Sequence, residues 1–455
     1  MSEGSAGLVI PPAPPVHAQV PPLPIYLFKF IRNSISALSD AAFEAPTLRK
    51  RIFGVDHLLI SDPDGARHVM IEARERYRRP YSSIRAIRPL TGAGLLLADG
   101  DAWRRQRRSL APSFTPPRVG ELLPHFHAAA QGLVQSLEGR ASVNLSAAFH
   151  DSTLEAVLRA LFSIEPGDGH RELAAMVRRY MDGVGKPNFL DGQARSEDDF
   201  QFAGRSRRAF QKEWFAAVDR LVAERRADPA AERKRDLLNL LLAARDPNTG
   251  EPLSDEEVRD QSATMLFAGF ETTSRLLFWA SYLLCLAPDE QRRLREEVRQ
   301  APPEGAAQMD DLAKWPRLRQ VLLETLRLYP PVAYLVRDAI EPDVVMGETV
   351  APGARVWISP WVIHRHRKFW DHPLAFMPER FEGQTSPWTN GPFMPFGVGP
   401  RLCIGAAFAM AEAEIMLATL ISRYEFALTD TRPVLPVANV TMRPSREPNF
   451  TLTPL

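Results

Sequence analysis

The sequence predicts a mainly α-helical fold with small β-sheets, in the α+β class. Three observations support this prediction. Apolar residues recur at helical spacing over most of the chain before residue 330, and the stretch 254–286 predicts one helix about 50 Å long. Short extended segments separated by turns follow at 332–363 and again at the C-terminus. The N-terminal residues are rich in proline, so we expect a tail over 1–24 and a single domain over 25–455.

The composition excludes several classes of protein. With 455 residues, 45% of them hydrophobic, the chain can bury a large core, and its net charge of +1 argues against a nucleic-acid-binding protein. Two cysteines are too few for a disulfide framework, which predicts a reducing compartment and, without a signal-peptide pattern, the cytoplasm. No apolar stretch is long enough to span a membrane. The segment "PLPIYLFKFI" predicts an amphipathic first helix, with light contact with a membrane surface as the alternative.

The first half of the domain predicts a series of helices. The segment 66–77 is amphipathic at helical spacing, whereas the prolines and glycines of 80–100 predict a loop. A helix is expected to restart near Asp101, and charged helices continue to about residue 244.

The long helix has well-defined ends in the sequence. Ser254 and Glu257 form a capping-box pattern, acidic residues occupy the first turn, and Pro288 ends the helix. Its middle, "ATMLFAGFETTSRLLFWA", is apolar on nearly every side, which predicts burial. Further along, 316–329 predicts another helix, "VAPG" a turn between short strands, and the residues from about 404 to 423 the last long helix.

Cys403 has an unusual setting. The stretch "FGVGPRLCIG" contains three glycines and places the cysteine directly before the last helix, whose N–H groups and dipole predict a lowered thiol pKa. Gly397, Gly399 and Gly405 give room where a flat group approaches the backbone, or where φ is positive. No second ligand stands at zinc spacing, so a single thiolate fits the axial ligand of an iron porphyrin. Cys285, by contrast, is expected to be a small buried hydrophobe.

The cysteine stretch matches the haem-binding signature of the cytochrome P450 family at Phe396, Gly399, Arg401, Cys403 and Gly405. The sequence therefore resembles that family, and its other motifs occur in the family's order over nearly all of the chain after the tail. The resemblance implies the cytochrome P450 fold, with haem b (iron protoporphyrin IX) between the long central helix and the cysteine-bearing helix. Cys403 would be the axial ligand of the haem iron.

The middle of the long helix resembles the family's oxygen-binding groove. In "AGFETT", Thr272 can hydrogen-bond to the carbonyl of Ala268, four residues earlier. The resemblance implies that Ala268 borders the groove and Gly269 leaves room for dioxygen. It also implies that Thr272 holds the dioxygen molecule and that Glu271 helps to deliver protons.

Further residues resemble the family's haem-binding and structural positions. The resemblance implies that the haem propionates are bound by Trp103, Arg107, Arg337 and Arg401. The signature residues Phe396, Gly399 and Gly405 would complete the haem site. The motifs "ETLRLYPP" and "FMPERF" imply a buried network that holds the cysteine loop, made of Glu324, Arg327 and Arg380.

The resemblance implies a haem-thiolate monooxygenase that inserts one oxygen atom of O2 into an apolar small molecule, by hydroxylation or epoxidation. An apolar pocket suits a lipid-like or terpenoid substrate, and family position suggests a lining of Ile84, Ile87, Phe267, Val332, Ala333, Tyr334 and Val440. The chain has no Gly-x-Gly-x-x-Gly site, so we expect electrons from a separate ferredoxin or flavodoxin with its reductase. Two alternatives stay open: a peroxide-driven peroxygenase, and a haem-thiolate sensor or binding protein without turnover.

Overall fold

The computed structural model describes residues 7–455 except 166, 187, 189–190, 193, 198, 231–233, 235, 246–249 and 390. The α-helices of the described residues are α1 (Leu23–Arg32), α2 (Pro63–Arg67), α3 (Tyr81–Thr91), α4 (Gly100–Leu110), α5 (Pro116–Gly120), α6 (Leu123–Leu137), α7 (Leu145–Phe162), α8 (Asp168–Asp182), α10 (Gly204–Ala227), α11 (Leu237–Ala243), α12 (Asp255–Leu286), α13 (Pro288–Gln300), α14 (Pro316–Leu328), α15 (Pro360–Ile363) and α16 (Ala406–Arg423). The strands are β1 (Thr47–Ile52), β2 (Val55–Ile60), β3 (Tyr77–Arg78), β4 (Ser142–Val143), β5 (Leu335–Ala339), β6 (Asp343–Val345), β7 (Glu348–Val350), β8 (Arg355–Ile358), β9 (Tyr424–Leu428), β10 (Pro436–Ala438), β11 (Met442–Pro444) and β12 (Phe450–Pro454).

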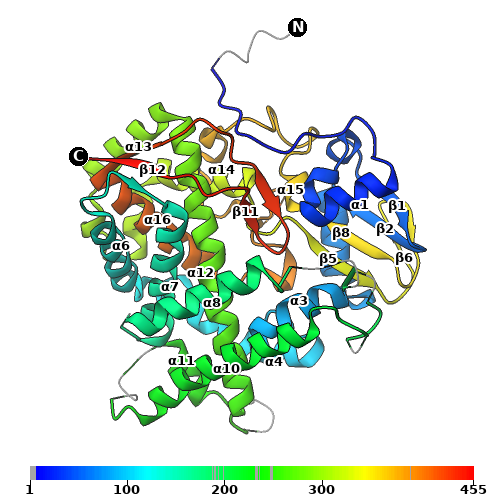
Figure 1. The fold of residues 1–455 in the computed structure, drawn as a ribbon, viewed down its shortest axis with the longest axis horizontal. Helices are drawn as coiled ribbons and strands as arrows, with labels where there is room; N and C mark the ends of the chain where they lie inside the picture. Colours follow the sequence, from blue (N-terminus) through cyan, green and yellow to red (C-terminus); the bar gives the residue numbers. More distant parts are fainter. Residues whose placement is uncertain are drawn as a thin grey trace.

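Helix α12 is the central element, as the sequence predicts. It extends over 32 residues from a complete capping box between Ser254 and Glu257, and most of its residues from Val258 onward are buried. It crosses the molecule from end to end, with helices on one side and the main sheet on the other (Figure 1). The side chains of α6, α7, α12, α14 and α16 join in one large apolar core. This burial explains why a helix of such length has so few charges along its middle.

The main sheet lies beside the helical part of the molecule (Figure 1). Its five strands have the order β1-β2-β8-β5-β3, with β2 and β8 parallel and the other neighbours antiparallel. A three-stranded sheet, β4-β12-β9, and two hairpins, β10-β11 and β6-β7, complete the β structure of the described residues. The predicted class, mainly helical with small sheets, is confirmed.

The predicted loop over 80–100 is wrong in its first half. Residues 81–91 form α3, in which Pro89 lies near the end, where the helix is about to stop at Gly92. Its other residues keep helical spacing, and burial of Ala86 and Leu90 against the core holds the helix in spite of Pro89. The predicted helix over 66–77 is also divided, into α2, a π-turn over 68–72 and a short 3₁₀ turn before β3.

The described part of the proline-rich segment contacts the body of the protein. The N–H of Phe376 donates to the carbonyl of Val9 (2.9 Å), and the Tyr329 hydroxyl donates to the carbonyl of Pro12 (3.0 Å). Residues 1–6 lie outside the described residues, and the division at residue 24 stays a prediction. A search of the described residues finds no helix that is both long and apolar enough to cross a membrane.

Candidate active site

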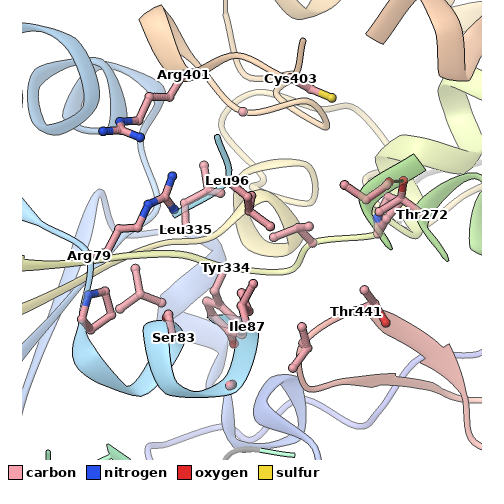
Figure 2. A pocket seen from close by; sticks show the side chains of 18 of the residues that line it. Arg79, Ser83, Ile87, Leu96, Thr272, Tyr334, Leu335, Arg401, Cys403 and Thr441 are labelled. Carbon is pink, nitrogen blue, oxygen red and sulfur yellow. Dashed lines mark hydrogen bonds between the residues drawn. The ribbon is translucent and has the colours of Figure 1, made fainter. Parts of the chain in front are cut away.

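A cavity of about 580 Å³ lies between α12 and the loop that carries Cys403. Cys403 points into it from one wall, while Thr272 on α12 and Thr441 before β11 lie at one end and Arg79 and Arg401 at the other (Figure 2). Strand β5, helix α3 and helix α1 supply the remaining walls. One cavity therefore joins the cysteine, the middle of α12 and a group of arginines.

The cysteine loop is fixed by backbone hydrogen bonds. The N–H of Cys403 donates to the carbonyl of Phe396 (2.9 Å), and the N–H of Leu402 donates to the carbonyl of Gly399 (2.9 Å). Gly399 has a φ of +73°. A side chain there would also collide with Ile71, because a Cβ would lie 2.4 Å from Ile71 Cγ1. Gly399 therefore serves the turn, and the structure does not place it in the cavity wall.

Gly405, unlike Gly399, leaves open space on the cavity side of the backbone. It lines the cavity, and a Cβ added to it would have no heavy atom within 4 Å. The backbone at the start of α16 is thus open toward the cavity, beside the Cys403 sulfur. This is the space that a flat group lying against the loop needs.

The pKa of the Cys403 thiol is raised, which corrects the sequence-based expectation. Burial within the protein is the largest cause, and the N–H of Gly405 and the charge of Arg107 oppose it without reversing it. The exposed surface of the Cys403 side chain faces the cavity. Desolvation therefore outweighs the helix terminus and favours the neutral thiol.

On the opposite wall, α12 presents Phe267, Ala268 and Thr272 to the cavity. The Thr272 hydroxyl donates to the carbonyl of Ala268 (2.9 Å), which is the local bond that the sequence suggested. Gly269 has a second explanation besides room for dioxygen: a Cβ there would lie 2.8 Å from Val157 Cγ2. The missing side chain thus allows close packing of α7 against α12.

Glu271 is not among the residues that line the cavity, and its role in proton delivery stays a prediction. It is 1% exposed and lies on the side of α12 that faces α7 and β11. Its carboxylate accepts hydrogen bonds from His150 Nε2 (2.7 Å) and Arg275 Nε (3.3 Å). Burial favours the neutral acid, but the charge of Arg275 and the His150 hydrogen bond outweigh it, so the pKa of Glu271 lies well below its usual value.

One side chain connects Glu271 to the cavity all the same. The hydroxyl of Thr441, which lines the cavity, donates to Glu271 Oε1 (3.0 Å). On the other side, His150 Nδ1 lies 3.5 Å from a guanidinium nitrogen of Arg178, whose side chain is 38% exposed. A continuous polar path therefore leads from the cavity through Thr441, Glu271 and His150 to the surface. Sequence reasoning missed Thr441 and His150, because they come from segments 170 and 121 positions away from Glu271, respectively.

The arginine end of the cavity is strongly cationic. The cavity is lined there by the four residues expected to bind propionates, and by one that the sequence did not single out: Trp103, Arg107, Arg337, Arg401 and Arg79. Burial and the neighbouring positive charges lower the pKa of Arg79 to about 9 and that of Arg337 to about 10. Arg401 stacks on the Trp103 ring (4.6 Å) and pairs with Asp99. These four arginines meet at one end of the cavity, where, among the described residues, the Asp99 carboxylate pairs with Arg401, so the site favours an anionic ligand.

Arg79 shows this preference most clearly. Its Nε is buried and has no hydrogen-bond partner among the described residues. The adjacent Arg78 is exposed, and among the described residues its side chain contacts Tyr81, with a hydrogen bond to the hydroxyl (2.7 Å). Nothing in the local pattern "YRRP" distinguishes the two arginines. Only the position of β3 beside β5 and Arg337 turns Arg79 toward the cavity.

The structure brings Glu324, Arg327 and Arg380 together. Arg327 donates two hydrogen bonds to Glu324 (2.7 Å each), and Arg380 Nε lies 3.5 Å from Glu324 Oε1. Arg327 also donates to the carbonyls of His364, Pro373 and Ala375, at 2.7–2.8 Å. Arg327 and Glu324 are fully buried, and these additional hydrogen bonds offset the free-energy cost of desolvating the ion pair in the core.

Of the expected pocket residues, five line the cavity: Ile87, Phe267, Val332, Tyr334 and Val440. Two predictions are wrong. Ile84 is not among the lining residues, since the face of α3 toward the cavity carries Ser83, Ala86 and Ile87. The prediction failed because we expected a loop there and not a helix. Ala333 is buried in the apolar core and is not among the lining residues, although its neighbours Val332 and Tyr334 are.

Comparison with known proteins agrees with this geometry. The family model for cytochrome P450 matches residues 22–451. The chain belongs to the cytochrome P450 family. A cytokinin hydroxylase of Arabidopsis thaliana is 34% identical over 384 residues, which are 80% of this chain and 73% of the relative. Cyclooctatin synthase of Streptomyces melanosporofaciens is 28% identical, over 86% of this chain and 84% of the relative.

Solved structures give the same result. The retinoic-acid-bound cyanobacterial CYP120A1 superposes with a TM-score of 0.76 at 26% identity, covering 90% of this chain and 92% of that one. The haem domain of cytochrome P450DA superposes with a TM-score of 0.77 at 24% identity, covering 98% of both chains, and shows the likeness of fold. The protein is a cytochrome P450 monooxygenase, an oxidoreductase, and the family implies a haem cofactor.

The residues of the site fit a haem. The open backbone at Gly405 leaves space beside the sulfur of Cys403. Arg79, whose Nε has no hydrogen-bond partner among the described residues, belongs to a cluster suited to two propionates. Phe396 lines the same space and packs edge-on against Trp388 (4.9 Å). Members of the family draw electrons from redox partners and act on small molecules.

Proposed function

We propose that the protein is a haem-thiolate monooxygenase that inserts one oxygen atom of O2 into an apolar small molecule, by hydroxylation or epoxidation. The observation that carries this proposal is the position of the Cys403 sulfur and of Thr272 on facing walls of one cavity, with the arginine cluster at its end. Cys403 would bind the iron of haem b, while Trp103, Arg79, Arg107, Arg337 and Arg401 would hold its propionates. When bound, the haem would supply the redox chemistry that cleaves dioxygen.

The polypeptide would contribute orientation and protons. Ala268 and Thr272 would border the place where oxygen reacts, and the Thr272 hydroxyl can donate a proton if it leaves the Ala268 carbonyl. Glu271, a carboxylate at rest, would take up each proton from the His150 side and pass it to Thr441, whose hydroxyl would turn from the carboxylate to give its own proton to a water in the cavity. His150, hydrogen-bonded to Glu271, would return the proton from the surface side.

The lining of the cavity supports an apolar substrate. Ile87, Leu96, Phe267, Val332 and Val440 leave few polar groups near Thr272, which suits a lipid-like or terpenoid molecule. We further propose that the electrons come from a separate ferredoxin or flavodoxin with its reductase, and that the protein works in the cytoplasm. Exposed arginines such as Arg104 and Arg108 follow Trp103 on α4 and offer a basic surface to an acidic partner.

The test is the spectrum of the reduced protein under carbon monoxide. We expect a Soret band at the wavelength diagnostic of thiolate ligation, lost in Cys403→Ala and kept in Cys285→Ala, which removes the other cysteine of the chain. A band that survives in Cys403→Ala would refute the proposal. Faster turnover with peroxide alone than with donor proteins would instead favour a peroxygenase. If no candidate substrate gave an oxygenated product with donor proteins or with peroxide, a sensor would be favoured.

A further inference from the structure

The cavity has a second region, away from α12, that the proposed reaction does not use. It extends beneath α1 to the outer strands of the main sheet, where its walls are Tyr26, Phe30, Ile52, His57, Tyr334 and Trp357. Helix α1 lies beside β1 and β2 (Figure 1). The rings of Phe30 and Tyr334 both meet the Trp357 ring edge-on, at 5.4 and 5.6 Å. We call this region the α1 arm.

His57 in the α1 arm is a neutral hydrogen-bond donor. The indole N–H of Trp357 donates to His57 Nδ1 (3.1 Å), so Nδ1 carries no proton. Burial and the charge of Arg355 lower the pKa of His57 to about 4, against a smaller opposing effect of Asp56, so the ring is neutral at pH 7. The remaining hydrogen must therefore be on Nε2. This N–H has no hydrogen-bond partner in the part of the chain that the structure describes.

Tyr26 supplies a second donor from the opposite wall. Burial raises the pKa of Tyr26 to about 12, so its hydroxyl stays protonated, and it too lacks a partner among the described residues. The ring is held by Phe30, stacked at 5.7 Å, and by the ammonium of Lys50, 3.6 Å from its centre. Lys50 is the cross-strand partner of His57, so the two side chains share one face of the sheet. Tyr26 and His57 consequently lie near each other.

The cations around the α1 arm, Arg355 and Lys50, already contact other groups of the protein. Arg355 pairs with Asp338 (2.8 Å) and donates to the carbonyl of Gly192 (2.9 Å), while Lys50 rests on Tyr26 and lies 3.4 Å from the carbonyl of Pro21. A carboxylate in the arm would lose its hydration without gaining a free cation. A hydrocarbon would leave both donors unpaired, which also costs free energy. The polar group that fits best is an uncharged oxygen that accepts hydrogen bonds.

We propose that the α1 arm is a binding site for a neutral hydroxyl or carbonyl oxygen of the substrate, which accepts hydrogen bonds from His57 Nε2 and the Tyr26 hydroxyl. The inference rests on the proposed function, because it names the substrate class of the same cavity. His57 pairs with Arg355 and Arg355 with Asp338, next to Arg337 of the propionate cluster, so His57 lies two strands, or about 10 Å, from β5. The substrate would be an extended apolar molecule with an oxygen at one end.

The test compares three ligands of equal chain length: a straight-chain alkane, its terminal alcohol and its carboxylic acid. Their dissociation constants for the haem-loaded protein are measured by calorimetry and by the haem absorbance shift. The alcohol should bind best. His57→Phe and Tyr26→Phe should each weaken alcohol binding about fivefold to tenfold and leave alkane binding unchanged, as expected for the loss of one hydrogen bond.

Two further variants separate this role from a structural one. Tyr81→Phe is the matched control, because Tyr81 is not among the residues that line the cavity and its hydroxyl accepts from Arg78 (2.7 Å), so the preference for alcohol should not change. His57→Gln can accept from Trp357 and still donate, so it should restore part of the preference. Equal weakening of alkane and alcohol, or tighter binding of the acid, would overturn the proposal. Failure of the haem-thiolate proposal would show instead in the carbon monoxide spectrum, which these variants should not alter.

Discussion

Thr441 Oγ1 donates a hydrogen bond to Glu271 Oε1 across 3.0 Å, and this contact joins a buried ion cluster to the cavity. Arg275 and Arg443 surround the same carboxylate, and His150 binds its other oxygen. The acid of the "AGFETT" motif is therefore linked to the cavity by a hydrogen bond from a residue near the C-terminus.

Replacement of Thr441 tests this connection. Thr441→Val removes the hydroxyl at nearly constant volume, and we expect the fraction of electrons that yield product to fall about tenfold, with a larger solvent isotope effect. Thr441→Ser keeps the hydroxyl and should stay close to the wild type. Unchanged coupling in Thr441→Val, at unchanged thermal stability, would show that protons take another path.

Glu271→Gln should destabilise the protein at neutral pH. It leaves Arg275, Arg443 and His150 without their carboxylate, and breaking such a buried cluster costs about 3–5 kcal/mol. The folded-state pKa of Glu271 is depressed, so its contribution is present above the unfolded pKa of about 4.3 and is lost as pH falls through the lower folded value. Urea unfolding at several pH values should show the difference between wild type and variant shrinking in acid. A difference that is constant with pH would contradict the ionised state.

The pKa of Glu412 on α16 is shifted upward, in the opposite direction to that of Glu271. Glu412 is fully buried, and neither carboxyl oxygen has a hydrogen-bond partner among the described residues, because the hydroxyl of nearby Thr273 donates to the Gly269 carbonyl (3.1 Å). Burial raises the pKa of Glu412 well above its usual value. The wild type should therefore lose stability as pH rises from the unfolded pKa through the folded one. In Glu412→Gln this part of the pH dependence should disappear, as measured by thermal unfolding between pH 5 and 9; an unchanged profile would refute a neutral Glu412.

Arg79→Gln should weaken haem retention. The substitution removes a buried cation from the propionate end of the cavity, and the loss of one charged hydrogen bond corresponds to about tenfold faster transfer of haem to an acceptor protein. Arg78→Gln is the control, since Arg78 is exposed and bonds to Tyr81. Equal effects of both substitutions would mean that a general loss of charge, and not a propionate contact, is responsible.

Gly269→Ala should destabilise the contact between α7 and α12. A Cβ 2.8 Å from Val157 forces the helices apart, at a cost of about 1–3 kcal/mol. The double variant Gly269→Ala with Val157→Ala should recover most of this stability, which chemical unfolding can measure. If Gly269→Ala changed ligand binding at the haem but not stability, room above the iron would be the main reason for the glycine.

The sequence by itself determined the elements whose signals are local. The capping box at Ser254 and Glu257, the apolar middle of α12 and the helix after Cys403 depend on neighbours within a few turns, and all three are confirmed. It also identified the cysteine loop, because backbone turns need glycine at fixed positions such as Gly399. Burial of Ala86 and Leu90 by the rest of the fold overrode the proline signal of 80–100, so α3 was not predicted.

Only the tertiary structure decided which distant side chains meet. Arg79 and Arg78 look alike in the sequence, and the pairing of β3 with β5 determines which of them faces the cavity. Glu271 was expected to help deliver protons, and the helical rotation of about 100° per residue turns it away from the cavity side of Thr272, toward α7 and Thr441. The Cys403 pKa follows the same rule: the helix terminus is a local feature, whereas the desolvation that outweighs it comes from the whole fold.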